Sequence, residues 1–78
     1  MSQPKVVIYT QQDCPPCTWV KKFFALRGME YEERGVDSGL AVARELAQKY
    51  NTQSTPTVVI GDQVLIGYDP DRLSQLLG

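Results

Sequence analysis

The sequence contains no histidine, so it lacks the side chain that most often works as a general base near neutral pH. The same absence removes the imidazole nitrogen that zinc and copper sites commonly use as a ligand. Acid–base catalysis or metal binding through imidazole is therefore excluded. Cysteine is scarce as well, and the two cysteines that are present become the main candidates for chemistry.

Long apolar runs and a strong charge of either sign are also missing. The formal net charge is −1, which gives no electrostatic footprint for DNA, RNA or an acidic membrane surface. No apolar run approaches the roughly 20 residues needed to span a bilayer, and residues 1–4 have no secretory-signal pattern. We therefore expect a cytoplasmic protein without nucleic-acid or membrane partners. A permanent structural disulfide would be unusual in the cytoplasm.

The length of 78 residues is near the lower limit for a domain with a self-sufficient core. The composition is ordinary for a globular protein, with 42% hydrophobic and 22% charged residues, and no repeat or linker is visible. We expect residues 1–78 to form a single domain that works as a monomer.

Hydrophobic periodicity and turn residues predict seven elements in the order β-α-β-α-β-β-α. Strands are expected over residues 5–9, 29–36, 57–60 and 63–66, and the last two flank a hairpin turn at Gly61-Asp62. Helices are expected over residues 15–27, to about residue 50 after a cap at Asp37 or Ser38, and from Pro70 after a cap at Asp69. A right-handed crossover followed by a hairpin gives an α/β fold with a four-stranded mixed sheet flanked by three helices.

The apolar residues of the first two helices are expected to form the core, because they recur at helical spacing. In the first helix they are Trp19, Val20, Phe23, Phe24 and Leu26. In the second helix they are Leu40, Ala43, Leu46, Ala47 and Tyr50. Trp19 and Phe23 are thus interpreted as core residues rather than as substrate contacts.

The motif that points to a function is Cys14-Pro15-Pro16-Cys17, which contains both cysteines. It lies between the first predicted strand and the first predicted helix. Two thiols at this spacing and in this place can close and reopen a disulfide with little backbone movement. In a reducing compartment the motif indicates a redox pair rather than a structural crosslink.

Cys14 is the expected nucleophile because it falls at the N-cap of the helix, where unpaired N–H groups and the helix dipole favour a thiolate. Cys17 lies one turn inside the helix and is the expected resolving thiol. Pro16 removes an N–H group near the Cys14 sulfur, which leaves the Cys17 N–H and the Thr18 N–H as donors. Asp13 adds a neighbouring negative charge that opposes the thiolate. We therefore expect a less acidic Cys14 and a more reducing site than with another residue at position 16.

Three segments together resemble the glutaredoxins, a small branch of the thioredoxin fold. They are Tyr9-Thr10 followed by Cys14-Pro15-x-Cys17, then Ser54-Thr55-Pro56-Thr57-Val58, and then Gly67-Tyr68-Asp69. The similarity covers essentially the whole chain in the expected order. It implies a thioredoxin-like fold in glutaredoxin form and a thiol–disulfide oxidoreductase that reduces protein disulfides or glutathione mixed disulfides. Residues 67–73 also look like the redoxins that serve ribonucleotide reductase and take electrons from thioredoxin reductase.

The resemblance also implies which residues contact the substrate. Thr55-Pro56 matches the family's cis-proline turn, where the preceding residue pairs with an extended substrate, and Gly67-Tyr68-Asp69 matches a segment that grips a peptide-like ligand. Gln11 stands where glutaredoxins commonly carry a lysine for the glutathione carboxylate, and Pro16 stands where tyrosine is frequent. No bound cofactor is implied, and glutathione is a possible reductant or substrate. The expected electron donor is either glutathione or thioredoxin reductase.

Other interpretations of the same residues remain open. Two cysteines supply half of a usual zinc site, so a metal site would need two chains. The resemblance implies a further alternative, a dimeric module in which an iron–sulfur cluster bridges two protomers. A third possibility is an interaction domain that has kept the fold and lost turnover, although the intact cysteine pair argues against it. Pro56 has an ordinary trans turn proline as its alternative. Tyr68 fits a place under the last helix as well as one in the groove, and Lys21 fits a solvated face or a place near the thiolate.

Overall fold

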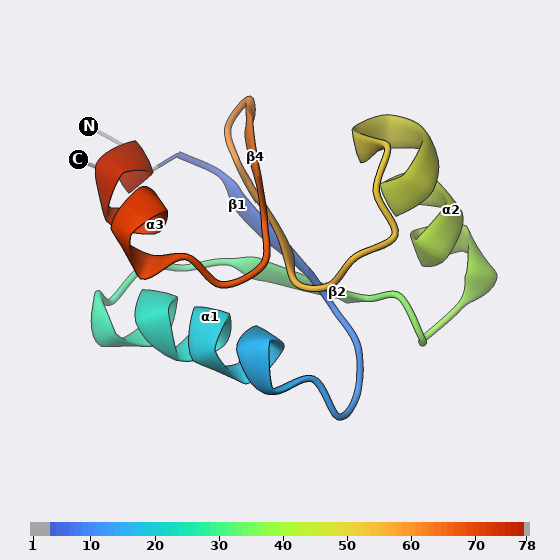
Figure 1. Ribbon diagram of the computed structural model, residues 1–78, viewed down its shortest axis with the longest axis horizontal. Helices are drawn as coiled ribbons and strands as arrows, with labels where there is room; N and C mark the ends of the chain where they lie inside the picture. The colour runs from blue at the N-terminus through green and yellow to red at the C-terminus, as the bar shows by residue number, and fades with distance from the viewer. Residues whose placement is uncertain (1–3, 78) are drawn as a thin grey trace.

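Four strands of the computed structural model form one mixed sheet, with helices on both of its faces (Figure 1). The structure describes residues 4–77. The elements in chain order are β1 (Val6–Thr10), α1 (Pro15–Leu26), β2 (Glu32–Gly35), α2 (Leu40–Tyr50), β3 (Thr57–Ile60), β4 (Gln63–Ile66) and α3 (Pro70–Leu77). This order confirms the predicted α/β, thioredoxin-like fold with three helices and a four-stranded mixed sheet.

The central strand β1 organises the sheet. The strand order is β2-β1-β3-β4, and β1 runs parallel to β2 and antiparallel to β3. Its side chains alternate between the two faces, with Val6 and Ile8 on one and Val7 and Tyr9 on the other. A strand covered on both faces needs apolar side chains at successive positions, which explains the unbroken run over residues 6–9.

The larger part of the core lies between the sheet and the helices α1 and α3, which share one face (Figure 1). Its buried members are Val6, Ile8, Val20, Phe24, Val58, Ile60 and Leu73. The Asp69 carboxylate accepts a hydrogen bond from the Arg72 N–H at 3.1 Å, which confirms the predicted cap of α3. The cap starts the helix at Pro70, so that Leu73 points into the core.

The opposite face of the sheet carries α2 and a smaller core of Tyr9, Leu46 and Val59. The Tyr9 hydroxyl donates a hydrogen bond to the Glu45 carboxylate, which also accepts one from Arg34 at 3.1 Å. Burial, and then the adjacent Glu45 carboxylate, raise the pKa of Tyr9 far above its ordinary value. The hydroxyl therefore stays protonated, and through Glu45 it links β1 and the edge strand β2 to α2.

Two residues of α1 that helical spacing assigns to the core lie on the surface instead. Trp19 is 54% exposed and Leu26 is 88% exposed, so the prediction that Trp19 is a core residue is wrong. The helix buries Cys17, Val20 and Phe24, and Phe23 packs partly buried beside them. Because each residue turns about 100° around the helix axis, Trp19 and Leu26 fall outside the buried stripe.

The start of α2 also differs from the prediction, because Gly39 is its N-cap and no side chain caps it. The Asp37 carboxylate instead accepts a hydrogen bond from the Gln12 N–H at 2.9 Å. The Ser38 hydroxyl donates to the Gly35 carbonyl oxygen at 2.6 Å. Both side chains are thus used to hold loops, and the predicted cap at Asp37 or Ser38 is wrong.

The buried face of α2 is narrower than the predicted one. Leu46 is buried as expected, but Leu40 at the first turn is exposed. Val42 and Tyr50 pack beside Leu46 against the small core, one helical turn away on either side. Asn51 ends the helix in the left-handed conformation with φ 55°.

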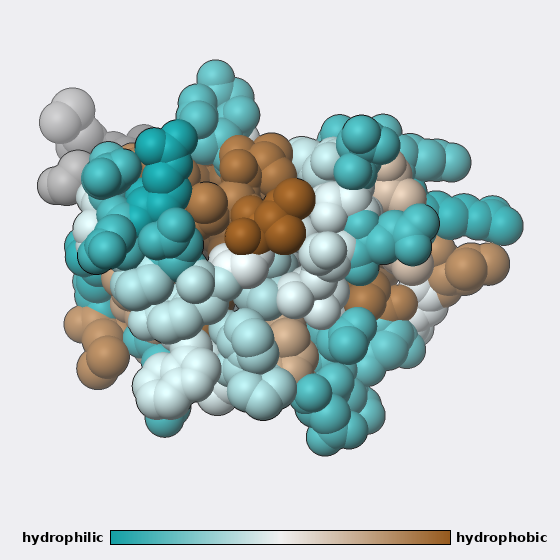
Figure 2. Space-filling model, in the orientation of Figure 1, coloured by the Kyte–Doolittle hydropathy of each residue, from teal (hydrophilic) through white to brown (hydrophobic). Residues whose placement is uncertain are grey.

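The two edge strands differ in the polarity of their exposed side chains. β2 is shorter than predicted, and its charged residues begin at Glu32, which suits an exposed edge. β4 exposes Val64 and Ile66, and Figure 2 shows hydrophobic atoms gathered over this strand.

The β3–β4 hairpin turns at Gly61 with φ 60°, as the Gly61-Asp62 pair predicts. Within residues 4–77, no helix is both long and apolar enough to cross a membrane.

We expect Leu73→Ala to destabilise the fold by about 2–4 kcal/mol, because it leaves a cavity where α3 packs on the core. Leu26→Ala is the matched control, since this leucine lies in a helix and is 88% exposed. Its effect should stay within about 0.5 kcal/mol. Urea unfolding of both variants measures the difference, and equal losses of stability would contradict the described packing of α3.

Candidate active site

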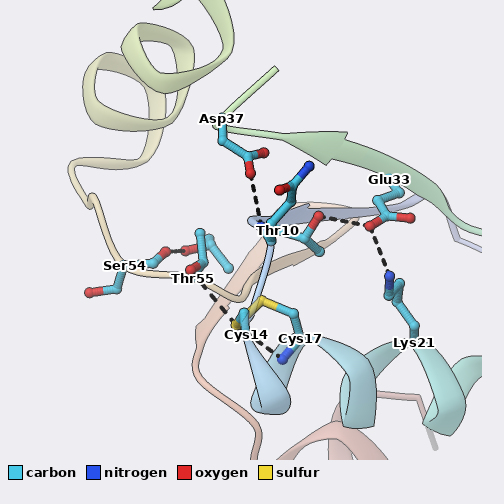
Figure 3. Close-up of a disulfide and its surroundings, with 10 residues drawn as sticks. Thr10, Cys14, Cys17, Lys21, Glu33, Asp37, Ser54 and Thr55 are labelled. Atoms are coloured by element: carbon cyan, nitrogen blue, oxygen red, sulfur yellow. Dashed lines mark hydrogen bonds and ion pairs between the residues drawn. A yellow bond between two sulfur atoms is a disulfide. The ribbon is translucent and has the colours of Figure 1, made fainter. Parts of the chain in front are cut away.

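The end of β1 and the start of α1 place the two cysteines next to each other (Figure 3). Cys14 is the N-cap of α1, as predicted, with extended backbone angles of φ −119° and ψ 94°. Asp13 adopts the left-handed conformation with φ 55° and turns the chain into the helix. The hydrogen bond between the Gln12 N–H and the Asp37 carboxylate holds this loop from outside.

Cys14 and Cys17 form a disulfide, and their Cα atoms are 5.3 Å apart. The two sulfurs differ in accessibility, because Cys17 is 2% exposed and Cys14 is half-buried. An external thiol or disulfide therefore has a path to Cys14 but not to Cys17. This asymmetry is the one that a nucleophile at Cys14 and a resolving thiol at Cys17 require.

Few hydrogen-bond donors face the Cys14 sulfur. Pro15 and Pro16 occupy the first two helical positions and have no N–H groups to offer. The Cys17 N–H donates to the Cys14 sulfur at 3.3 Å. The Thr18 N–H donates to the Cys14 carbonyl oxygen at 3.2 Å instead, so it is not the further donor to the sulfur that was expected.

A second donor comes from a distant part of the chain. The Thr55 hydroxyl lies 3.9 Å from the Cys14 sulfur, and it is the donor in the oxidised protein because a disulfide sulfur carries no hydrogen. The Thr55–Pro56 peptide bond is cis, which confirms that prediction and excludes the trans alternative. The Thr57 hydroxyl donates to the Ser54 carbonyl oxygen at 2.7 Å and fixes the turn on its other side.

The segment before α3 approaches the same turn. The Gly67 N–H donates to the Pro56 carbonyl oxygen at 2.8 Å, so two segments that the resemblance assigns to substrate binding are joined. The Tyr68 ring stacks on the Trp19 ring of α1, with centroids 6.5 Å apart. Both rings are substantially exposed, so Tyr68 lies over α1 at the surface rather than under α3.

The remaining predicted residues are exposed around the cysteines, and no hydrogen bond to a cysteine side chain is recorded for them within residues 4–77. Gln11 is exposed in the loop before Cys14, and Pro16 is exposed on the first turn of α1. The Asp69 carboxylate caps α3, so its hydrogen-bonding capacity is partly used within the chain. The structure therefore joins Cys14, Cys17, Thr55, Pro56 and Gly67 and leaves the other candidates at the rim.

Sequence reasoning missed a polar cluster beside the cysteines. The Glu33 carboxylate of β2 accepts hydrogen bonds from the Thr10 hydroxyl at 2.8 Å and from the Lys21 ammonium at 3.1 Å (Figure 3). The bond from Thr10, followed by the bond from Lys21, lowers the pKa of Glu33. The three residues come from three elements, so no local pattern signals the cluster. Lys21 is thereby held by Glu33 rather than by the cysteine sulfur.

An open hollow of about 690 Å³ lies beside Cys14. It is bounded by the loop over residues 11–13 and by the first two turns of α1. Among residues 4–77, no three histidine, cysteine, aspartate or glutamate side chains are grouped as a metal site needs. What the arrangement offers is an accessible sulfur at a helix N-terminus, a buried partner sulfur and space for a substrate.

A thioredoxin-like sheet that carries a C-x-x-C disulfide at the start of its first helix defines a class, the thiol–disulfide redox proteins. A comparison with protein families narrows this class, because the sequence model of the family described as Glutaredoxin matches residues 6–65. The chain belongs to the glutaredoxin family, which confirms the resemblance seen in the sequence.

Individual relatives agree with this assignment. The chain is 33% identical over 66 residues to glutaredoxin from Pseudomonas aeruginosa, covering 85% of this chain and 79% of that protein. It is 31% identical over 72 residues to the glutaredoxin-like protein NrdH from Escherichia coli, covering 92% and 88%. The solved structure of NrdH-redoxin from that organism has a TM-score of 0.81 at 30% identity, covering 92% and 93%. The solved thioredoxin-like protein BC3987 has a TM-score of 0.88 at 44% identity, covering 94% and 100%.

We expect Thr55→Val to raise the pKa of the Cys14 thiol, because the substitution removes a hydroxyl donor and keeps the side-chain shape. A smaller thiolate fraction should slow the attack on a disulfide at neutral pH by about two- to fivefold. Thr55→Ser keeps the hydroxyl and serves as the control. Thiolate ultraviolet absorbance against pH measures the shift, and identical titrations of the valine and serine variants would refute the role of the hydroxyl.

We expect Glu33→Gln to reduce stability by less than about 1 kcal/mol at neutral pH, since the ion pair with Lys21 is solvent-exposed and screened. The pKa of Glu33 is lowered in the folded state, so its carboxylate contributes fully to the free energy of unfolding at pH values above the unfolded-state pKa of about 4.3. That contribution is lost as the pH falls below this value toward the folded-state pKa.

The difference in unfolding free energy between wild type and Glu33→Gln should therefore shrink between neutral pH and about pH 3. Asp62→Asn, in the exposed β3–β4 turn, is the control for loss of a surface carboxylate. Urea unfolding across this pH range is the measurement. A difference for Glu33→Gln that does not depend on pH would show that the carboxylate charge contributes nothing.

Proposed function

We propose that this protein is a dithiol oxidoreductase that reduces protein disulfides or glutathione mixed disulfides with Cys14 and Cys17. The observation that carries the proposal is the asymmetry of the pair. The half-buried Cys14 sulfur accepts a hydrogen bond from the Cys17 N–H at 3.3 Å, while Cys17 itself is buried. A thiolate at Cys14 is stabilised and reachable, and a thiol at Cys17 is protected until an intermediate forms.

The reaction starts from the reduced dithiol. The Cys14 thiolate attacks one sulfur of the substrate disulfide, a new S–S bond forms, and the other substrate sulfur leaves with the electron pair and then takes a proton. Cys17 loses its proton and attacks the Cys14 sulfur of this mixed disulfide. The second substrate sulfur leaves and is protonated, and the Cys14–Cys17 disulfide of the described structure remains. The substrate has gained two electrons from the enzyme and two protons, of which Cys17 has released one and the solvent supplies the other.

Regeneration of the dithiol needs an external two-electron donor. Glutathione and thioredoxin reductase are the two candidates, and Gln11 bears on the choice. A lysine at this position would give the glutathione carboxylate a charge-assisted hydrogen bond worth about 1.5–3 kcal/mol, which the neutral glutamine cannot match. The solved NrdH-redoxin is described as having a thioredoxin-like activity profile. We therefore propose thioredoxin reductase as the preferred donor, with glutathione as the weaker one.

The substrate is proposed to lie across Thr55, Pro56 and the segment Gly67-Tyr68-Asp69. Thr55 is next to the Cys14 sulfur, and Gly67 is joined to Pro56 by a backbone hydrogen bond, so a bound chain would meet both segments at once. Gln11 lines the hollow beside Cys14, and Pro16 is exposed on the first turn of α1, so both are proposed to meet the substrate there. The proposed protein needs no bound cofactor, because the dithiol itself carries the reducing equivalents.

The test follows NADPH consumption while the protein reduces a small disulfide. One assay contains thioredoxin reductase, and the other contains glutathione with glutathione reductase. We expect faster turnover with thioredoxin reductase and no turnover of Cys14→Ser with either donor. Cys17→Ser should stop after the first step and accumulate a mixed disulfide that mass spectrometry detects.

The same assays can overturn the proposal. Turnover by glutathione alone would contradict the preferred donor and keep the reaction class. No turnover with either donor, from a protein whose dithiol is intact, would reject the oxidoreductase. Visible absorbance of anaerobically purified protein would then identify the alternative, a dimeric module that binds an iron–sulfur cluster.

A further inference from the structure

The hollow beside Cys14 continues along α1, and neither Thr55 nor the cis proline is among the residues that line it. Cys14, Thr18 and Lys22 all border it, and residues four apart lie on the same side of a helix. A chain that places its reactive sulfur at Cys14 therefore has a track along the first two turns of the helix. This track is distinct from the proposed contacts at Thr55 and Gly67.

The charges along this track are unequal. Lys21 is paired with the Glu33 carboxylate at 3.1 Å, so part of its charge is already neutralised. The Lys22 ammonium lies 5.2 Å from the centre of the Trp19 ring and is bound by no carboxylate among residues 4–77. Asp13 borders the hollow at its other end, beside Cys14. The far end of the track is thus cationic and the near end is not.

We infer that this track binds an acidic segment of the protein substrate, with Lys22 as the residue that recognises the carboxylate. The inference rests on the proposed function and adds a preference for substrate sequence. An ammonium that no carboxylate neutralises attracts an anion, and its position over the exposed Trp19 ring holds it at the border of the hollow. Such complementarity mainly raises the rate at which the right substrate associates in the right orientation.

The spacing along the helix fixes where the acidic residues should be. Eight residues of helix separate the Cα atoms of Cys14 and Lys22 by about 12 Å, and an extended chain covers that distance in three to four residues. The preferred substrate therefore carries Asp or Glu three or four residues from its reactive cysteine. Acidic residues seven or eight positions away would lie beyond Lys22 and contribute little.

The experiment uses the full-length reduced protein and symmetric peptide disulfides, each strand with one cysteine. Four peptides carry acidic, neutral or basic pairs at positions three and four from the cysteine, or the acidic pair at positions seven and eight. Single-turnover rate constants are measured for wild type and Lys22→Glu, with Lys22→Gln as a milder variant. Lys49→Glu is the matched control, because Lys49 is also exposed, also lies over an aromatic ring and belongs to α2 on the other face of the sheet.

For wild type, the ratio of the rate constants for the acidic and the basic peptide should be about ten at low ionic strength. It should approach one at high ionic strength, where surface charges are screened. Lys22→Glu should lower this ratio about tenfold, Lys22→Gln should lower it less, and Lys49→Glu should change it by less than about twofold. The peptide with distant acidic residues should react like the neutral one.

Equal effects of Lys22→Glu and Lys49→Glu would overturn the inference, because only the net charge would then matter. Equal rates for the near and the distant acidic peptides would overturn it as well. In both cases reduction of the neutral peptide leaves the proposed function intact. Failure of wild type to reduce any of the peptides would instead reject the proposed function, and the inference with it.

Discussion

Ile8 and Tyr9 are neighbours in β1, yet each is enclosed by a different layer of helices on opposite faces of the sheet. This burial on both faces fixes the register of the strand, since a slip by one residue would exchange every side chain between two dissimilar cores. Thr10 ends the strand and is held by Glu33, and Cys14 follows after one short loop. The position of the reactive sulfur therefore depends on packing that lies mostly outside the site.

The chemistry at Cys14 depends on a balance between local and remote donors. The two prolines at the start of α1 rigidify the motif but withhold N–H groups from the sulfur. The fold then brings the Thr55 hydroxyl to the sulfur from a segment some forty residues away in the chain. Two parts of the chain therefore contribute different properties to the site. Helix α1 sets the geometry of the cysteine pair, and the turn before β3 supplies one of the hydrogen-bond donors to the Cys14 sulfur.

The sequence was sufficient to predict the fold, because the strong signals are local ones. The run over residues 6–9, the hairpin at Gly61 and the cap at Asp69 each report on their own neighbourhood. It was also sufficient for the N-cap position of Cys14, which follows from the motif and the helix it opens. These features need no knowledge of what the rest of the chain does.

The errors arose where tertiary contacts decide the outcome. Asp37 has the residue type of a helix cap, but the Gln12 N–H of a distant loop uses its carboxylate. Trp19 belongs to an apolar series, but only one side of α1 faces the sheet and the indole falls outside that side. The Thr10–Glu33–Lys21 cluster joins three elements, so no periodicity could reveal it.

Trp19 is the only tryptophan of the chain, and it lies two residues after Cys17 of the disulfide. Its ring stacks on the Tyr68 ring. An indole at the surface so close to a sulfur pair has an emission that depends on its solvent contact and on nearby quenching groups. Trp19, which its helical spacing assigned to the core, thus gives the protein a single tryptophan fluorophore at the edge of its reactive motif. Reduction of the disulfide and binding of a partner chain can therefore be followed through the tryptophan fluorescence, without an added label.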